Sequence, residues 1–427
     1  MSQILIASII TVIVLALFVT QAIPISITAV FGALAMAFAG IISFEDALAG
    51  YASDAVMLTI GAMTMGSALT ECGVTTLIGH TLLKLPKVGE SEKLFLGIVL
   101  VVCAFLSAFL SNVACVAMFL PLVAATARLS EGRITKKNTY MAIGMAAVAG
   151  GGCTLVGSTP QLIAQGILQT TEGCDPMTFF EITKGGIIVV IFVVLYFVTI
   201  GYALEKKVLD FEEVPDVIDT PADEEEIEIN KPKAILSSAI FLTCIVLFVV
   251  GVGTVGGVGM AGGALCIATK CISEKKAFKM MDWTAVAILG GTLGIAKGLN
   301  ASGTIQLAAE KTLDLFGGQD ANPFILCFAI FLLSTALGNI VSHTATAAIL
   351  CPLGISLALS LGSNPIAFVV AVVLGSNASF ITPTATTPVT MTLVGGYRFM
   401  DYVKIGTPLN IISAIVTGLL VPIFYGV

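Results

Sequence analysis

Polar side chains interrupt an otherwise apolar stretch between Leu337 and Leu353, which reads LGNIVSHTATAAILCPL. One of them, His343, is one of only two histidines in the chain. An imidazole can donate hydrogen bonds to an anion and gains a positive charge within the physiological pH range. A lone histidine can also be a neutral, hydrogen-bonded packing residue, so its role depends on the rest of the sequence.

The same kind of polar motif occurs twice in the chain. SNVACVAMFLP (111–121) pairs with SHTATAAILCP (342–352) at an offset of 231 residues. CTLVGSTPQ (153–161) pairs with ITPTATTPV (381–389) at an offset of 228. A glycine-rich segment that precedes both motifs is also repeated, with Gly61 opposite Gly291. Matches in the same order at nearly constant spacing predict an internal duplication.

The composition predicts the class of protein. Hydrophobic residues make up 57% of the 427 residues, charged residues only 11%, and the mean hydropathy is +1.03. Several apolar runs approach the length of about 20 residues that a helix needs to cross a bilayer. We therefore expect an all-α, multi-pass protein of the plasma membrane whose partners are the lipid bilayer and a small solute, with no nucleic acid.

The chain divides into two halves joined by an acidic segment. Ten of its 27 acidic residues lie between Asp210 and Glu228, which predicts a solvated cytoplasmic linker over 206–233. The first repeat is predicted over 1–205 and the second over 234–427, each with five crossings. Because five is odd, the second repeat enters the membrane from the opposite side, as in the inverted repeats of secondary transporters.

One apolar segment in each half is left over from this count. Lysine and arginine residues flank 94–126 on both sides, which predicts that both ends are cytoplasmic and that the segment is an inner re-entrant hairpin. The flanks of 323–360 are poor in basic residues, so we expect an outer hairpin there. The following crossings, about 138–168 and 365–395, contain Gly, Pro, Ser and Thr and are predicted to be helices broken near the midplane. This topology predicts that both termini lie outside the cell.

Four polar breaks at repeat-equivalent positions favour a binding site over simple close packing of small residues. Helix N-termini there would offer N–H groups and positive dipole ends to an anion. The predicted hairpins and breaks contain no Asp or Glu, which argues against a cation as the cargo. The sequence also contains no catalytic pair or metal-ligand cluster, so we do not expect an enzyme.

The paired motifs resemble the Ser-Asn-Thr hairpin motifs and the Gly-Thr-Pro-Pro-Asn-type motifs of the divalent anion:sodium symporter family. That family includes dicarboxylate, citrate and sulfate carriers. The resemblance implies an elevator-type homodimer that transports a divalent anion, with a dicarboxylate as the first candidate, by coupling to cations or by exchange. A metalloid-oxyanion or sodium/proton exporter of the same superfamily is the alternative.

The resemblance also implies which residues form the sites. The first sodium site would use Ser107, Asn112 and Gly157, and the second would lie near Gly338, position 343 and Ala385. The residues implied in substrate binding are Ser111, Asn112, Ser158, Ser342, His343, Thr344 and Thr386.

Two positions depart from the family pattern. Val113 stands where the family has threonine, and His343 stands where it has an asparagine that serves both the substrate and the second cation. A protonated imidazole would supply a positive charge at that place and so offset a buried anion, as a second sodium ion would. We therefore expect sodium at the first site and, through His343, a proton in place of the second.

Overall fold

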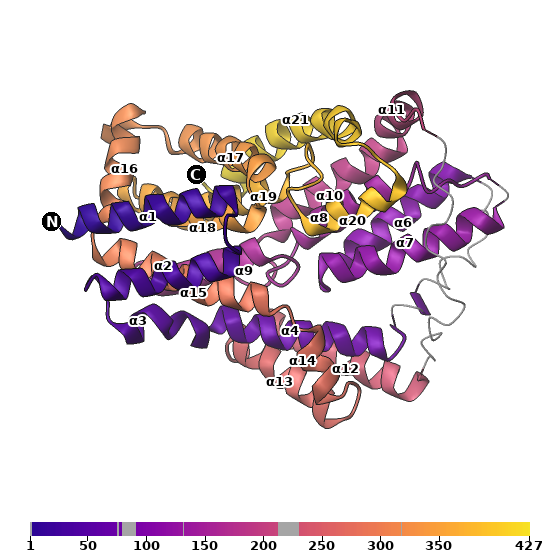
Figure 1. Ribbon diagram of the computed structural model, residues 1–427, viewed down its shortest axis with the longest axis horizontal. Coiled ribbons are helices and arrows are strands. Elements are labelled where there is room, and N and C mark those ends of the chain that lie inside the picture. Colours follow the sequence, from indigo (N-terminus) through magenta and orange to yellow (C-terminus); the bar gives the residue numbers. More distant parts are fainter. Residues whose placement is uncertain (1, 75–76, 79–90, 131, 212–229, 317) are drawn as a thin grey trace.

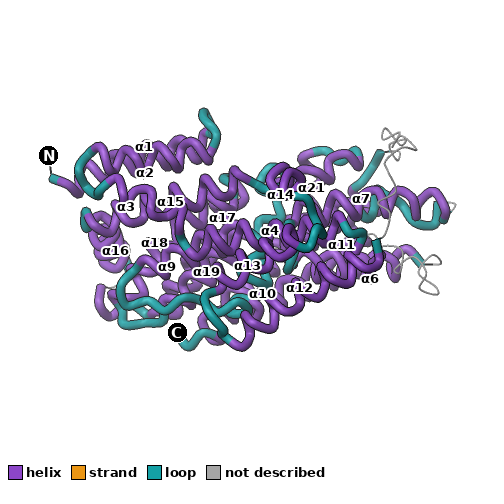
Figure 2. Tube along the Cα trace, turned by 90° about the horizontal axis from the view of Figure 1, so that it is seen from below, coloured by secondary structure: helices purple, strands orange, loops and turns teal. Residues whose placement is uncertain are grey.

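A computed structural model describes all residues except 1, 75–76, 79–90, 131, 212–229 and 317. Every regular element in this described part of the chain is a helix (Figure 2). Six of the described helices are long and apolar enough to cross a membrane. A seventh span results if α10 (Thr183–Val198) and α11 (Ile200–Val208), which are bent by 50°, count as one. The expected all-α, polytopic fold class is confirmed.

The described α-helices of the first half are, in chain order, α1 (Gln3–Thr20), α2 (Ile25–Phe38), α3 (Phe44–Leu48), α4 (Asp54–Glu71), α6 (Glu92–Ser107), α7 (Asn112–Leu129), α8 (Tyr140–Gly151), α9 (Thr159–Thr170), α10 (Thr183–Val198) and α11 (Ile200–Val208). The second half contains α12 (Lys231–Val250), α13 (Val255–Ala268), α14 (Glu274–Met280), α15 (Trp283–Ala301), α16 (Thr304–Leu315), α17 (Pro323–Ile340), α18 (His343–Ser360), α19 (Pro365–Asn377), α20 (Thr387–Met391) and α21 (Phe399–Phe424).

The helices break at the paired motifs. The chain leaves helical structure between α6 and α7 and between α17 and α18, and the two helices of each pair pack against each other. It also breaks between α8 and α9 and between α19 and α20, at the Gly-, Pro- and Thr-rich segments. The re-entrant course of the hairpins, and the inverted orientation of the two halves, stay predictions.

The same packing recurs in both halves. The α6 helix packs on α8 and α10, and α17 packs correspondingly on α19 and α21. The α4 helix packs on α13, and α2 packs on α15 in the same way. A Cβ atom on Gly61 would overlap the backbone of Gly259, and one on Gly291 would overlap that of Ala29. These two repeated glycines therefore permit the close approach of helices that small residues allow in membranes.

Two bundles result from this packing (Figure 1). The flanking bundle contains α1 to α4 and α12 to α15. The hairpin bundle contains α6 to α10 and α17 to α21. The α9 helix of the hairpin bundle also packs on α4 and α15, so it joins the two.

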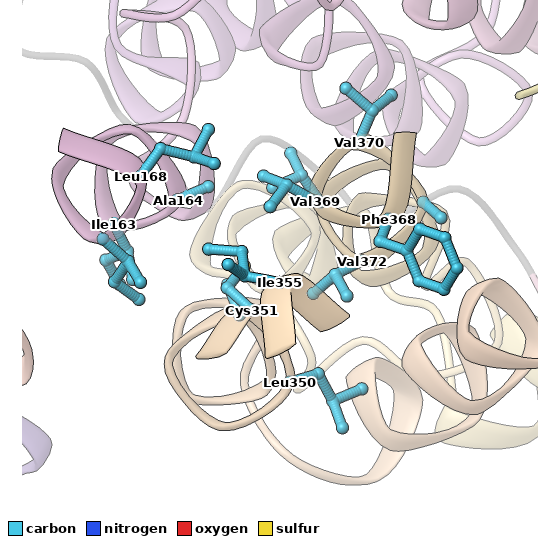
Figure 3. Close-up of a cluster of buried hydrophobic side chains, with 14 of the residues drawn as sticks. Ile163, Ala164, Leu168, Leu350, Cys351, Ile355, Phe368, Val369, Val370 and Val372 are labelled. Carbon is cyan, nitrogen blue, oxygen red and sulfur yellow. The ribbon is translucent and has the colours of Figure 1, made fainter. Parts of the chain in front are cut away.

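The core of the hairpin bundle is built from both halves of the chain. Figure 3 shows Ile163 and Leu168 of α9 packed with Cys351 and Ile355 of α18 and with α19 side chains such as Val369. Correspondingly, α20 packs on α7 and α8. Each broken helix therefore lies against the hairpin of the other half, which brings the four breaks into one region.

The linker prediction lies mostly outside the described residues, which resume at Asn230 after the gap at 212–229. Its predicted first residue falls inside α11, which continues to Val208, and α12 begins at Lys231. The helices thus extend a few residues into the predicted linker at both ends.

Candidate functional site

Four helices begin at the polar breaks, and each begins after a hydroxyl side chain. The N-cap residues are Ser111 for α7, Ser158 for α9, Ser342 for α18 and Thr386 for α20. Only the Ser342 hydroxyl caps its own helix, by accepting a hydrogen bond from the Ala345 N–H at 3.2 Å. The other three hydroxyls make no capping bond. That of Ser158 lies 3.4 Å from Asn377 Oδ1, and those of Ser111 and Thr386 are available to a ligand beside the first-turn N–H groups.

Local chemistry explains why α9 and α20 begin where they do. Proline occurs at the second position of each helix, as Pro160 and Pro388. Proline is favoured in the first turn because its missing N–H group would have no partner within the helix. The preceding Ser158 and Thr386 have the extended backbone that an N-cap requires. The two motifs therefore place a hydroxyl at the start of each broken helix.

An oxygen-rich cluster surrounds the start of α7. One amide atom of Asn112 lies 2.6 Å from the Ser107 hydroxyl oxygen, 3.0 Å from the Gly157 carbonyl oxygen and 3.2 Å from the Ala147 carbonyl oxygen. If that atom is nitrogen, it donates to the two carbonyls. If it is oxygen, it lies among three other oxygen atoms. The structure thus brings together all three residues expected at the first sodium site.

Glycines shape this cluster. A Cβ atom on Gly151 would overlap the Asn112 amide, and one on Gly157 would overlap the Gly151 carbonyl. The Gln161 side chain adds a hydrogen bond from its Nε2 to the Gly151 carbonyl oxygen at 2.7 Å. Carbonyl, amide and hydroxyl oxygens are the ligands that hard cations take in proteins. The donor set therefore fits a sodium ion held by Ser107, Asn112 and backbone carbonyls.

The repeat-equivalent position in the second half has different chemistry. Gly338 and His343 stand where the first half has Ser107 and Asn112, so a hydroxyl and an amide are replaced by a hydrogen atom and an imidazole. The His343 ring lies against the Ala385 backbone, and its Nδ1 atom is buried with no hydrogen-bond partner. Gly338 packs closely against the Ser376 backbone. The structure thus joins two of the three residues of the expected second cation site.

Two further buried polar atoms without a hydrogen-bond partner lie at the break between α19 and α20. They are Thr386 Oγ1 and Asn377 Nδ2. The Asn377 side chain, at the end of α19, also places its Oδ1 3.4 Å from the Ser158 hydroxyl at the start of α9. Buried polar groups are nearly always satisfied, so unpartnered ones at the two breaks before α18 and α20 are consistent with a bound polar ligand.

The remaining expected residues have simpler surroundings. Thr344 is buried in the first turn of α18. Ser111 is exposed at the break between α6 and α7, and the neighbouring Val113 side chain is also exposed. Val113 therefore presents an apolar surface where a threonine hydroxyl was expected from the family.

Sequence reasoning missed Asn377 and Ala147. Asn377 is the one amide in the apolar run VVAVVLGSNASF, and this polar interruption could have identified it. Ala147 contributes only a backbone carbonyl, which no side-chain pattern reveals.

Comparison with known proteins gave consistent results. The family model described as citrate transporter (CitMHS) matches residues 15–353 and again residues 245–427. An uncharacterized transporter of Haemophilus influenzae is 29% identical over 428 residues, covering 94% of this chain and 87% of the relative. The sodium-dependent dicarboxylate transporter SdcS of Staphylococcus aureus is 25% identical over 447 residues, covering 96% and 84%.

A solved structure shares the fold. The YdaH transporter of Alcanivorax borkumensis superposes with a TM-score of 0.61 and 14% sequence identity, covering 87% of this chain and 85% of that one. At this identity the likeness concerns the arrangement of helices alone.

Proposed function

This chain belongs to the citrate transporter family (CitMHS), and from that membership we propose that it moves a small divalent anion, with a dicarboxylate as the first candidate, by sodium-coupled secondary active transport. The protein is a membrane transporter and not an enzyme. The observation that carries it is the cluster of Ser107, Asn112 and the carbonyls of Ala147 and Gly157.

Sodium coupling is expected because this cluster lies beside the helix N-termini that would bind the anion. A sodium ion there would lie next to Ser111 and the first turn of α7, since Asn112 is the first residue of that helix. Burying a divalent anion without compensation costs far more than hydrogen bonds recover. A cation bound beside the anion offsets this cost, so each ion favours binding of the other.

The anion would be held by the four helix starts. The hydroxyls of Ser158 and Thr386, together with first-turn N–H groups, are the primary donors, and Thr386 Oγ1 is buried without a partner. The outer hairpin contributes Ser342, His343 and Thr344. Donors from both halves suit a small ligand with a carboxylate at each end.

His343 would take over the role of the second cation. A buried positive charge without a partner is costly, and a bound dianion beside His343 would offset that cost. The ring would then take up a proton together with the substrate. The proton enters the coupling because the Gly338 and His343 pair offers neither of the side-chain oxygens that Ser107 and Asn112 supply.

Transport would proceed by elevator-type alternating access in a homodimer of the plasma membrane. The division into a flanking bundle and a hairpin bundle supports this, because the candidate site lies wholly in the second. The contacts of α9 with α4 and α15 would then form part of the sliding surface. An exporter of metalloid oxyanions or of sodium in exchange for protons remains the alternative function.

Uptake into proteoliposomes tests the proposal. A panel of dicarboxylates, citrate and sulfate is offered while the sodium and pH gradients are varied separately. We expect sodium-driven uptake of at least one dianion, and loss of sodium dependence in Ser107→Ala. Ser360→Ala, an exposed serine at the far end of α18, is the matched control. Export without uptake, or transport of a cation alone, would favour the alternative.

A further inference from the structure

An apolar groove lies between the flanking bundle and the outer hairpin, away from the anion site. It is lined by α1, α15, α16 and α18, and its cavity volume is about 170 Å³. Figure 1 shows α1, α16 and α18 gathered at the N-terminal side of the molecule. The walls include Phe18 of α1, Leu299 of α15, Ile305 of α16 and Leu353 of α18.

The polar side chains in the lining are already satisfied. Three threonines occur there. Thr11 donates to the Ala7 carbonyl oxygen at 2.7 Å and Thr292 to the Ile288 carbonyl oxygen at 2.8 Å. Thr304 shares a hydrogen bond of 2.8 Å with Ser302. Because these hydroxyls already have hydrogen-bond partners, the groove presents mainly hydrocarbon to an occupant. Its lining leaves no unpaired hydroxyl to bind an anion or a sugar.

The α1 helix, which forms one wall of the groove, also has an exposed apolar face. That helix is apolar enough to cross a membrane and only 17% of its span is buried within the protein. Its outward side chains, such as Ile9, Val12 and Ile13, are exposed. In a bilayer these residues contact acyl chains, so the molecules available to enter the groove laterally are lipids.

We propose that this groove binds one acyl chain of a membrane lipid. An apolar protein cavity of about 150 Å³ is large enough to bind benzene and otherwise stays dry, so a cavity of this size accepts part of a hydrocarbon chain in preference to water. The occupant is defined by its tail, since the lining offers no charged side chain to a headgroup.

The position of the groove gives the bound chain a consequence for transport, and this step rests on the proposed function. One wall is the α18 helix, through Ala348, Ile349, Pro352 and Leu353. The same helix begins at the candidate site residues Ser342 and His343. The other walls belong to α1, α15 and α16. A chain between them fills space into which the hairpin would otherwise move, so occupancy restrains the outer hairpin.

The first test measures binding without measuring transport. A phospholipid carrying a photoreactive diazirine on its acyl chain is incorporated into nanodiscs with the full-length protein, and labelled peptides are mapped by mass spectrometry. We expect labelling of α16 and α18 peptides that line the groove. Ala308→Phe fills the groove from an exposed position on α16 and should lower this labelling several-fold. Ala16→Phe, on the exposed face of α1 outside the groove, should not.

Two results would overturn the proposal. One is equal groove labelling in Ala308→Phe, Ala16→Phe and the parent. The other comes from a photoreactive amino acid placed at Leu353: adducts with a second copy of the chain instead of with lipid would make the groove a contact between subunits. Both outcomes are independent of transport activity. If labelling behaves as expected while uptake of every anion fails, the lipid site stands and the proposed function falls.

Discussion

The sodium cluster can be tested through the one amide atom of Asn112 that lies among three oxygens. Asn112→Ala removes this atom, which is 2.6 Å from Ser107, 3.0 Å from Gly157 and 3.2 Å from Ala147. If it is the oxygen ligand of a sodium ion, its loss resembles the loss of a hydrogen bond to a charged group, about 1.5–3 kcal/mol. That corresponds to a rise of roughly ten- to hundredfold in the half-saturating sodium concentration.

The assay is initial uptake of a fully ionised dicarboxylate into proteoliposomes over a range of sodium concentrations. Protein stability is followed in parallel, since an ion that binds only the folded state raises the melting temperature as its concentration rises. Asn112→Ala should shift both sodium curves in the same direction. If the sodium curve for uptake shifts but the sodium curve for the melting temperature does not, the substitution impairs substrate binding and leaves sodium binding intact.

Asn112→Asp separates the two orientations of the amide. A carboxylate keeps an oxygen among the oxygens of Ser107, Ala147 and Gly157 and adds negative charge, so it should preserve or strengthen sodium binding. If the atom is instead a nitrogen that donates to the carbonyls of Ala147 and Gly157, the aspartate loses both bonds and places a charge against two carbonyl oxygens. Sodium curves unchanged in Asn112→Ala, with the protein folded, would refute the cluster as an ion site.

The remaining predictions concern the anion site and the topology. In the parent, uptake of a fully ionised substrate should weaken as pH rises above the ordinary imidazole range near about 6.5, because the neutral ring no longer offsets the charge of the anion. His343→Asn should lose that pH dependence and gain sodium dependence. If His343→Asn and His343→Gln both keep the pH profile of the parent, a charged ring is rejected. Thr386→Ala should weaken apparent substrate affinity roughly ten- to hundredfold, as expected for a lost hydrogen bond to a charged group, while near-normal uptake would place the anion elsewhere. Cysteines introduced at positions 93 and 137 should both react with a reagent supplied from the cytoplasmic side, and labelling from opposite sides would reject the inner hairpin.

Local signals in the sequence determined where the helices break. Pro160 and Pro388 are favoured in the first turn of a helix, and Ser158 and Thr386 have side chains suited to the N-cap. These preferences act over three or four residues and do not depend on distant contacts. For the same reason, the polar tips of the hairpins could be located from the motifs that begin at Ser111 and Ser342.

Tertiary structure alone decided which of these residues meet. The packing of α9 on α18 and α19 brings Ser158 to Asn377, and these residues are far apart in sequence with no shared local pattern. The approach of the Ala147 and Gly157 carbonyls to Asn112 likewise depends on how closely α7 and α8 can pack, which the absence of a side chain at Gly151 permits. Backbone carbonyls have no sequence signature, because every residue has one, and their convergence depends on the packed positions of separate helices.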